Sequence, residues 1–198
     1  MAGASPGADE EKPQRLFVAV DLPPATLEAV ESASAAWRAR LGEGVGRWVV
    51  TENQHVTVAF LGRTWPRQMD WVHRRLAQAA ARVRPFDTGL AAFGVFPGRP
   101  SARVLWLGLD ERGGGWDALA ASVRSSLAEE FPAEKRPYTP HLTLARFEPR
   151  ASFADHADAL AEPIESPRFR VGAITLYRSH LMRPRPRYEP LARFRLKG

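Results

Sequence analysis

The 198 residues of the chain are 44% hydrophobic and 25% charged, which is typical of a globular protein with an apolar core and excludes a disordered or fibrous chain. The chain contains no cysteine, so disulfides, thiolate metal sites and a cysteine nucleophile are excluded. Its formal net charge of +6 at pH 7 comes mainly from arginine, which is compatible with an RNA or nucleotide partner and equally with a genomic bias toward arginine.

The N-terminal segment, residues 1–13, is small, polar and proline-containing, and we expect it to be a disordered tail. It lacks the apolar run of a signal peptide, and no part of the chain approaches the roughly 18 to 20 apolar residues that a membrane-spanning helix needs. We therefore expect a cytoplasmic protein without a membrane partner. Residues 14–198 are expected to form a single domain that acts as a monomer.

Strands and helices alternate in the first half of the chain. The apolar run 16–20 predicts a strand, and the helical spacing of apolar residues over 27–41 predicts a helix after it. Two strand-like runs follow at 47–50 and 54–61. A second apolar stripe over 69–83 predicts another helix.

The second half begins with a predicted hairpin. Apolar segments at 86–96 and 102–109 are separated by the turn sequence PGRPS. The clearest amphipathic stripe of the sequence then predicts a helix over 116–131. Further strand-like segments lie at 140–147, 169–177 and 188–196, with a weak helical patch at 153–160. Because the hairpin spacing favours antiparallel pairing, the predicted fold class is α+β.

One short pattern occurs twice, once in each half of the chain. The segment that starts at His55 reads HVTVA, and the segment that starts at His141 reads HLTLA. Since alternate side chains of a strand point to opposite faces, His55 shares a face with Thr57, and His141 shares one with Thr143. A single copy is most often just a strand. Two copies in a chain with five histidines predict two pseudo-equivalent lobes that face each other across a cleft.

Two imidazoles and two hydroxyls in one cleft suit chemistry at a phosphate. Displacement at a phosphodiester needs a base for the attacking oxygen and an acid for the leaving oxygen, and histidine, with an unperturbed pKa near ~6.5, suits both tasks. Threonine hydroxyls can donate to the non-bridging oxygens, and a nearby arginine, for which Arg146 is the candidate, can stabilise the growing charge. No acid-rich cluster accompanies the motifs, so we expect neither a metal site nor another cofactor.

Further segments add to this pattern: RLFVAVDLP from residue 15, VLWLG from 104, RPYTPHLTLAR from 136, LYRS from 176 and RYE from 187. With these flanks, the two motifs resemble the bacterial and archaeal RNA 2′,3′-cyclic phosphodiesterases, also called 2′-5′ RNA ligases, of the two-histidine phosphoesterase superfamily. The resemblance covers about residues 15 to 196.

The resemblance implies a bilobal, pseudo-symmetric fold, with two antiparallel sheets lining a central cleft and helices outside. It also implies metal-free hydrolysis of a 2′,3′-cyclic phosphate at an RNA end to a 2′-phosphomonoester. By motif position, His55 resembles the family's proton donor to the departing 3′ oxygen, and His141 resembles its proton acceptor from water. Thr57 and Thr143 would hold the phosphate. Arg146 matches the family's arginine after the second motif, but strict alternation from His141 points it away from the cleft unless a bulge or a strand end intervenes.

Two aromatic residues have weaker assignments. Phe17 lies on a strand expected beside the histidine strands, and Tyr138 lies close to the second motif. Either could stack on a base of the RNA, although aromatic residues in such strands more often belong to the core.

Three alternative functions use the same features. A 2′-5′ RNA ligase or a small cyclic-nucleotide phosphodiesterase needs the same groups, and in water hydrolysis should dominate over ligation. A non-catalytic module that binds RNA ends needs only basic charge and aromatic residues. Two complete motifs argue against the last alternative, because a binding module needs no acid on one side and base on the other.

Overall fold

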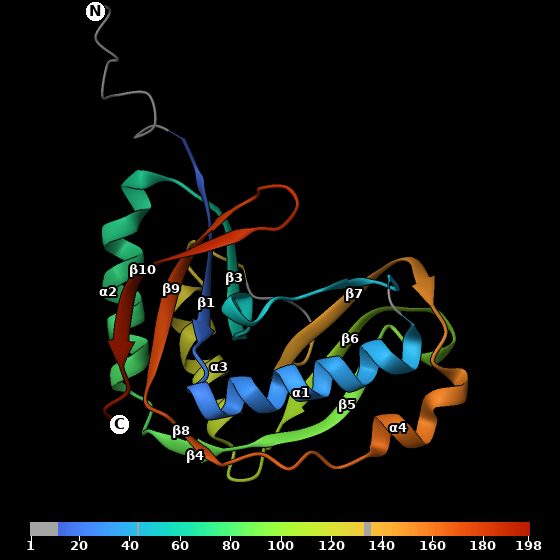
Figure 1. Ribbon diagram of the computed structural model, residues 1–198. Helices are drawn as coiled ribbons and strands as arrows, with labels where there is room; N and C mark the ends of the chain where they lie inside the picture. The colour runs from blue at the N-terminus through green and yellow to red at the C-terminus, as the bar shows by residue number, and fades with distance from the viewer. Residues whose placement is uncertain (1–11, 43, 133–135) are drawn as a thin grey trace, which may run out of the picture.

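The computed structural model describes residues 12–42, 44–132 and 136–198. Within these ranges the strands form two four-stranded antiparallel sheets and one short two-stranded ladder, with the helices on the outside (Figure 1). Of the tail expected at residues 1–13, only Lys12 and Pro13 fall within the described residues.

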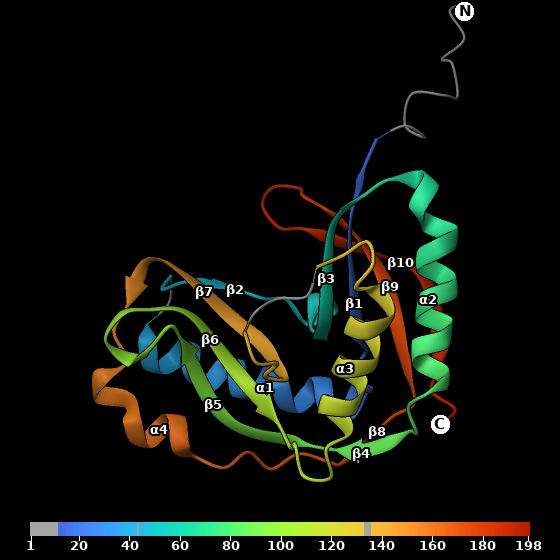
Figure 2. The ribbon, with the colours of Figure 1, turned by 180° about the vertical axis from the view of Figure 1, so that it is seen from behind.

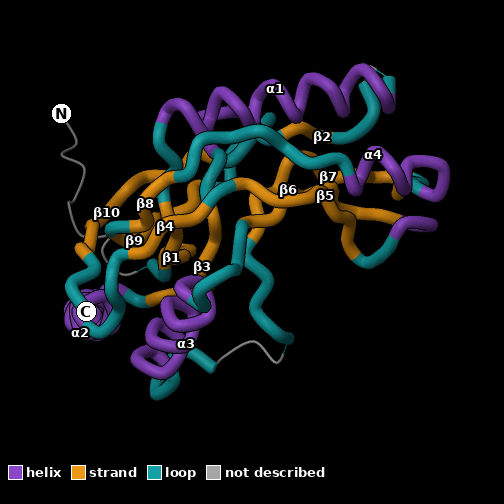
Figure 3. Tube along the Cα trace, turned by 90° about the horizontal axis from the view of Figure 1, so that it is seen from below, coloured by secondary structure: helices purple, strands orange, loops and turns teal. Residues whose placement is uncertain are grey.

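The first sheet has the strand order β10-β9-β1-β3 and is covered by α2 and α3 (Figure 3). Its elements are β1 (Gln14–Val20), β3 (Val56–Thr64), α2 (Met69–Ala81), α3 (Gly115–Leu127), β9 (Ala173–His180) and β10 (Arg187–Arg195). The predicted apolar stripe of α2 is buried at Val72, Leu76 and Ala79. The hydroxyl of Ser122 in α3 donates to the carbonyl of Ala79 at 3.0 Å, so the two helices pack against each other.

The second sheet has the strand order β2-β7-β6-β5, and α1 runs along it (Figure 2). Its elements are α1 (Pro24–Leu41), β2 (Arg47–Trp48), β5 (Leu90–Phe96), β6 (Ala102–Leu109), β7 (His141–Ala151) and α4 (Ala157–Ala161). Trp37 of α1 is only 2% exposed. Its ring centroid lies 5.4 Å from that of Phe93 in β5 and 5.6 Å from that of Phe153, which fixes α1 on this sheet.

Two helices each follow a strand of one sheet and pack on the other sheet. Helix α1 follows β1 of the first sheet but covers the second, and α3 follows β6 of the second sheet but packs on the first. Strands β4 (Phe86–Thr88) and β8 (Phe169–Val171) form the short ladder, to which Trp116 of α3 is tied by an Nε1–H bond of 3.1 Å to the Thr88 hydroxyl. The buried side chains of both sheets accordingly belong to one apolar cluster.

The observed elements confirm the predicted α+β fold and its two antiparallel sheets with helices outside. Several boundaries differ from the prediction: the segments 86–96 and 169–177 are each divided into two strands, and the helix expected over 116–131 ends at Leu127. Two further differences lie close to the first histidine motif. The strand expected at 47–50 is shortened to Arg47–Trp48, and the strand expected at 54–61 begins at Val56. His55 therefore lies directly before β3 rather than within it. None of the described helices is both long and apolar enough to cross a lipid bilayer.

Candidate active site

The two histidine motifs face each other between the two sheets. His55 directly precedes β3, and His141 is the first residue of β7. Both imidazoles, together with Thr57 and Thr143, line one cavity of about 490 Å³, which we call the imidazole cavity. The two copies of the sequence motif thus contribute to a single site.

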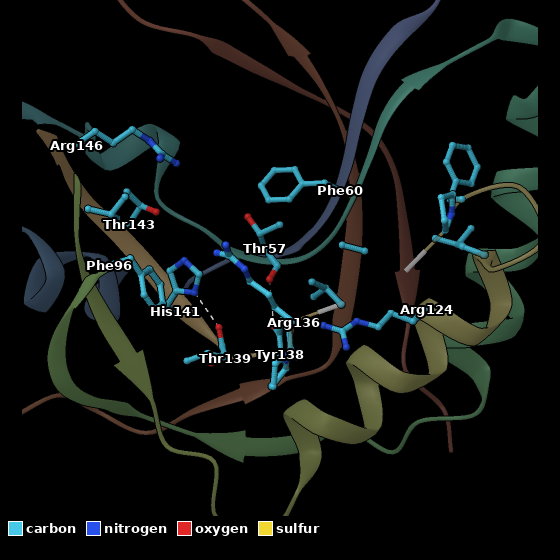
Figure 4. Close-up of a pocket in the computed structure, with 17 residues that line it drawn as sticks. Thr57, Phe60, Phe96, Arg124, Arg136, Tyr138, Thr139, His141, Thr143 and Arg146 are labelled. Atoms are coloured by element: carbon cyan, nitrogen blue, oxygen red, sulfur yellow. Dashed lines mark hydrogen bonds between the residues drawn. The ribbon is translucent and has the colours of Figure 1, made fainter. Parts of the chain in front are cut away.

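A second cavity of about 410 Å³ adjoins the first and shares His141, Thr57 and Thr143 with it (Figure 4). It is lined in addition by Arg124 of α3 and by Arg136 in the segment before β7, and we call it the arginine cavity. His55 does not line it. The site therefore extends into two cavities, and the imidazole of His141 lines both of them.

Both imidazoles are held in the same orientation by the backbone. Nδ1 of His55 lies 2.8 Å from the carbonyl oxygen of Asn53, and Nδ1 of His141 lies 2.8 Å from that of Thr139. Because a carbonyl oxygen only accepts hydrogen bonds, each Nδ1 carries the proton that is donated. Each Nε2 has no protein partner among the described residues and is free to accept or donate a proton in the site.

A β-bulge occurs at the same position in both motifs. In β3, Thr57 pairs with Ala19 and Ala59 pairs with Val18, so Val58 is the extra residue. In β7, Thr143 pairs with Trp106 and Ala145 pairs with Leu105, so Leu144 is the extra residue. A bulge of one residue reverses the alternation of the side chains that follow it.

The bulges bring one more residue of each strand to the site. Phe60 and Arg146 occupy the same place in the two motifs, each directly after the alanine. Both side chains are exposed, and both line the two cavities. The bulge that the sequence required for Arg146 to face the cleft is therefore present, at Leu144.

The two threonine hydroxyls are available for a ligand. Thr57 and Thr143 are half-buried, and neither hydroxyl has a hydrogen-bond partner among the described residues. The hydroxyl of Tyr138 does bind Thr57, but it donates to the backbone carbonyl of Thr57, at 3.1 Å, and not to the side chain. Two free donors next to two imidazoles match the requirements of a bound phosphate.

His55 is enclosed by aromatic rings. Its ring centroid lies 4.9 Å from that of Phe17 and 5.2 Å from that of Tyr188. Burial lowers the pKa of His55, and the charge of His141 lowers it further, while the hydrogen bond to Asn53 and the negative charge of Asp21 act in the opposite direction. The net effect favours the neutral imidazole in the free protein.

His141 has a similar apolar environment but a different charged neighbour. Its ring lies 5.3 Å from that of Phe96 and 6.0 Å from that of Trp106. Burial lowers the pKa of His141, against the hydrogen bond to the carbonyl of Thr139, and the positive charge of Arg146 lowers it further. A nearby cation thus disfavours a proton on this imidazole.

The two halves of the site therefore differ in charge. Asp21, which acts on His55, is held by hydrogen bonds from the hydroxyl of Thr175 at 2.7 Å and from that of Tyr177 at 2.6 Å. Arg146 acts on His141. The anion raises the proton affinity of one imidazole and the cation lowers that of the other, so the surrounding charges act on the two imidazoles in opposite directions.

A model of the 2′-5′ RNA ligase superfamily matches residues 22–182, which is most of the chain. The chain belongs to this superfamily. An Escherichia coli (strain K12) protein named RNA 2′,3′-cyclic phosphodiesterase is 34% identical over 189 residues, which cover 93% of this chain and 98% of that protein. A Geobacillus stearothermophilus protein of the same name is 32% identical over 188 residues, which cover 94% of this chain but 59% of that relative's length.

Solved structures agree with membership of the 2′-5′ RNA ligase superfamily. A protein of Thermus thermophilus superposes with a TM-score of 0.79 at 26% identity, over 93% of this chain and 98% of that one. Escherichia coli LigT in its apo form superposes with a TM-score of 0.75 at 32% identity, over 94% of this chain and 99% of that one. The fold and the sequence thus point to the same superfamily.

The structure of this superfamily member brings most of the residues predicted for the site together. His141, Thr57, Thr143 and Arg146 line both cavities, and His55 lines the imidazole cavity. These positions agree with the prediction of one shared site.

The two aromatic candidates have different surroundings. Phe17 lines the imidazole cavity but is only 3% exposed, and its ring is stacked against that of Tyr177 at 5.3 Å and tilted against that of His55 at 4.9 Å. Its ring thus contacts the imidazole of His55, and its role in binding a base stays a prediction. Tyr138 lines the arginine cavity and lies beneath the guanidinium of Arg124, at 5.5 Å from the ring centroid.

Several lining residues were not among the predicted ones. Phe60 is 61% exposed at the junction of the two cavities, although it is a large apolar side chain. The repeat could have indicated Phe60, because Phe60 has the same position in the first motif as Arg146 has in the second. Arg136 and Tyr188 lie in segments that carry the resemblance but were not assigned to the site, whereas Arg124 had no such signal, because it comes to the site from α3.

Proposed function

We propose that the protein hydrolyses 2′,3′-cyclic phosphate ends of RNA to 2′-phosphomonoesters, with its two histidines as acid and base. The observation that carries this proposal is the presence of both imidazoles, with free Nε2 atoms, and two threonine hydroxyls at one cavity. Support also comes from the relatives named RNA 2′,3′-cyclic phosphodiesterase and from Escherichia coli LigT, which has crystal structures with phosphate and with 3′-AMP.

In the proposed reaction, Nε2 of His141 takes a proton from a water molecule as the water oxygen bonds to phosphorus. The bond between phosphorus and the 3′ oxygen breaks, and its electron pair remains on that oxygen. Nε2–H of His55 then protonates the 3′ oxygen. Since the 2′ ester bond stays intact, the product carries a 2′-phosphate and a free 3′-hydroxyl.

The charges around the site support this division of roles. Asp21 favours the protonated form of His55, as a general acid requires, and Arg146 favours the neutral form of His141, as a general base requires. Burial lowers both pKa values, and the negative charge of a bound phosphate acts in the opposite direction by favouring the proton on His55.

The threonines are proposed to donate hydrogen bonds to the non-bridging oxygens. We expect Thr57→Val and Thr143→Val each to lower kcat/KM by about ten-fold, because one hydrogen bond to an anion is lost while the shape is retained. Steady-state kinetics on a cyclic-ended oligonucleotide measure this effect. Thr57→Ser and Thr143→Ser keep the hydroxyl and serve as controls; if they lose as much activity as the valine variants, the hydroxyl is not what the site uses.

Asp21 is proposed to raise the proton affinity of His55 without contacting the substrate. Asp21→Asn retains the size of the side chain but removes the negative charge, so the pKa of His55 falls. The alkaline limb of the kcat/KM profile, where His55 loses its proton, is then expected to move to lower pH by up to about one pH unit. Asp158→Asn, at an exposed position of α4, is the control. An alkaline limb that stays in place in Asp21→Asn contradicts this role.

The proposed partner is an RNA end, and one chain is enough to act on it. Both imidazoles and both threonines come from a single chain, which supports a monomer as the active form. The absence of cysteine supports the cytoplasm as the proposed compartment.

Product analysis tests the proposed function. An RNA oligonucleotide with a 2′,3′-cyclic phosphate end is incubated with the protein, with and without EDTA, and the product is compared with authentic 2′- and 3′-phosphate standards. We expect the 2′-phosphate in both reactions. A 3′-phosphate product would overturn the roles of the histidines, loss of activity in EDTA would overturn the metal-free mechanism, and failure to hydrolyse the oligonucleotide would overturn the function itself.

A further inference from the structure

The arginine cavity extends the site beyond the groups that the proposed hydrolysis uses. Arg124 reaches into it from α3, and Arg136 reaches into it from the segment before β7 (Figure 4). Together with Arg146, three guanidinium groups line this space, and none of its described lining residues is acidic. A cavity with this charge favours an anion.

Arg124 is held in place from the catalytic side of the cavity. Its guanidinium lies over the ring of Tyr138, and the hydroxyl of Tyr138 donates to the backbone carbonyl of Thr57 at 3.1 Å. The position of Arg124 is thus tied to the residue that is proposed to hold the reacting phosphate. A guanidinium fixed in this way loses little further freedom when it binds a ligand.

Neither Arg124 nor Arg136 is used to hold the fold together by an ion pair. No carboxylate in the described ranges forms a salt bridge with either of them, in contrast to Arg112 and Arg168, which both bind Asp110 at 2.8 Å. Arg124 is half-buried, and its planar group presents donors that match two oxygens of one phosphate.

We propose that Arg124 and Arg136 form a second phosphate subsite, which binds a phosphodiester of RNA next to the reacting phosphate. This inference rests on the proposed function. It makes an oligonucleotide a better substrate than a cyclic mononucleotide, because only the oligonucleotide carries a second phosphate.

Two RNA strands can supply this phosphodiester. One is the strand that ends in the cyclic phosphate. The other is a strand whose 5′-hydroxyl replaces water: its oxygen bonds to phosphorus and gives its proton to His141, while the 3′ oxygen leaves with a proton from His55, so a 2′-5′ linkage forms. The arginine cavity includes His141 but not His55, so it lies on the side of the attacking oxygen and fits the second strand geometrically.

The first arm of the experiment compares a trinucleotide that ends in a 2′,3′-cyclic phosphate with 2′,3′-cyclic AMP. We expect Arg124→Ala and Arg136→Ala to lower the ratio of the two kcat/KM values by about ten-fold if the substrate strand supplies the phosphate. The second arm adds a 5′-hydroxyl dinucleotide and measures the ratio of ligated product to hydrolysed product. We expect the same two variants to lower this ratio by a similar factor if the attacking strand supplies the phosphate.

Salt dependence separates charge from structure. In the arm whose ratio falls, loss of one arginine is expected to reduce the magnitude of the slope of log kcat/KM against log salt concentration by about 0.7. Arg124→Lys keeps the charge and should retain the wild-type slope. Arg74→Ala, at an exposed position of α2 that lines neither cavity, is the matched control.

A fall of either ratio with a reduced salt slope supports the subsite and identifies the strand. If both ratios and the slope stay at their wild-type values in Arg124→Ala and in Arg136→Ala, the subsite is overturned. Arg136 is exposed in a loop, so its replacement does not endanger the fold. If the wild-type protein hydrolyses neither substrate, the proposed function has failed, whereas hydrolysis with unaffected ratios removes the subsite alone.

Discussion

Replacement of either site histidine by alanine is expected to lower kcat by on the order of 10² to 10⁴, because each change removes one proton-transfer partner from the reaction. His55→Ala removes the proton that the 3′ oxygen receives, and His141→Ala removes the base for the attacking water. Steady-state kinetics on a cyclic-ended oligonucleotide measure the loss. Thermal unfolding should show little change, since each Nδ1 binds only a neighbouring backbone carbonyl.

His73→Ala is the matched control for these variants. His73 is a half-buried histidine of α2 that packs against Phe194 and lines neither cavity, so its loss should leave kcat near the wild-type value. If His55→Ala and His141→Ala unfold at much lower temperature, or retain activity within a few-fold of wild type, the two imidazoles are structural and the proposed mechanism fails.

Arg146→Ala is expected to lower kcat by on the order of 10² to 10³, because the guanidinium faces the site where charge grows on the non-bridging oxygens. The same change removes a cation from the neighbourhood of His141, so the pKa of His141 rises. The acidic limb of the pH–rate profile, where the base becomes protonated, therefore moves to higher pH. Kinetics over a pH series measure both effects in one experiment.

Arg150→Ala tests whether the position of the cation matters. Arg150 lies on the same strand, is exposed and donates to the hydroxyl of Ser101, away from both cavities. Its loss removes one positive charge without removing a group from the site. Equal losses of activity in the two variants would show that Arg146 acts only through the overall charge of the protein.

The repeated motif allowed the core of the site to be predicted from the sequence. An imidazole and a hydroxyl two residues apart on a strand share a face, and this local rule places His55 with Thr57 and His141 with Thr143. The rule does not depend on which strands pair. The structure adds that both motifs line the same cavity, which a duplication suggests but local geometry alone does not establish.

The two bulges could not be predicted from the alternation of side chains along a strand. Regular alternation places Arg146 on the wrong face, and only the known pattern of the family required a bulge before it. Leu144 is the extra residue of that bulge. The equivalent bulge at Val58 directs the side chain of Phe60 toward the site. No rule of spacing indicates a bulge in a run of apolar residues, so Phe60 could be predicted only by treating the two motifs as equivalent.

The electrostatic asymmetry and the arginine cavity could not be predicted from the sequence. Asp21, which accepts a hydrogen bond from Tyr177 of β9, acts on His55 by its charge, and Arg124 meets Tyr138 although one lies in α3 and the other before β7. These contacts depend on how the two sheets and their helices pack. Sequence spacing contains no information about them, because they join segments that are distant in the chain.

The pH dependence of kcat/KM for wild type, His55→Ala and His141→Ala tests the acid–base pair most directly. The wild-type profile should be bell-shaped, and its maximum should lie below the ordinary histidine pKa of ~6.5, because burial lowers the pKa of both histidines. His55→Ala should lose the alkaline limb, and His141→Ala should lose the acidic limb. A flat wild-type profile between roughly pH 5 and 9, measured where chemistry limits the rate, would contradict the account and leave the two histidines only a role in binding phosphate.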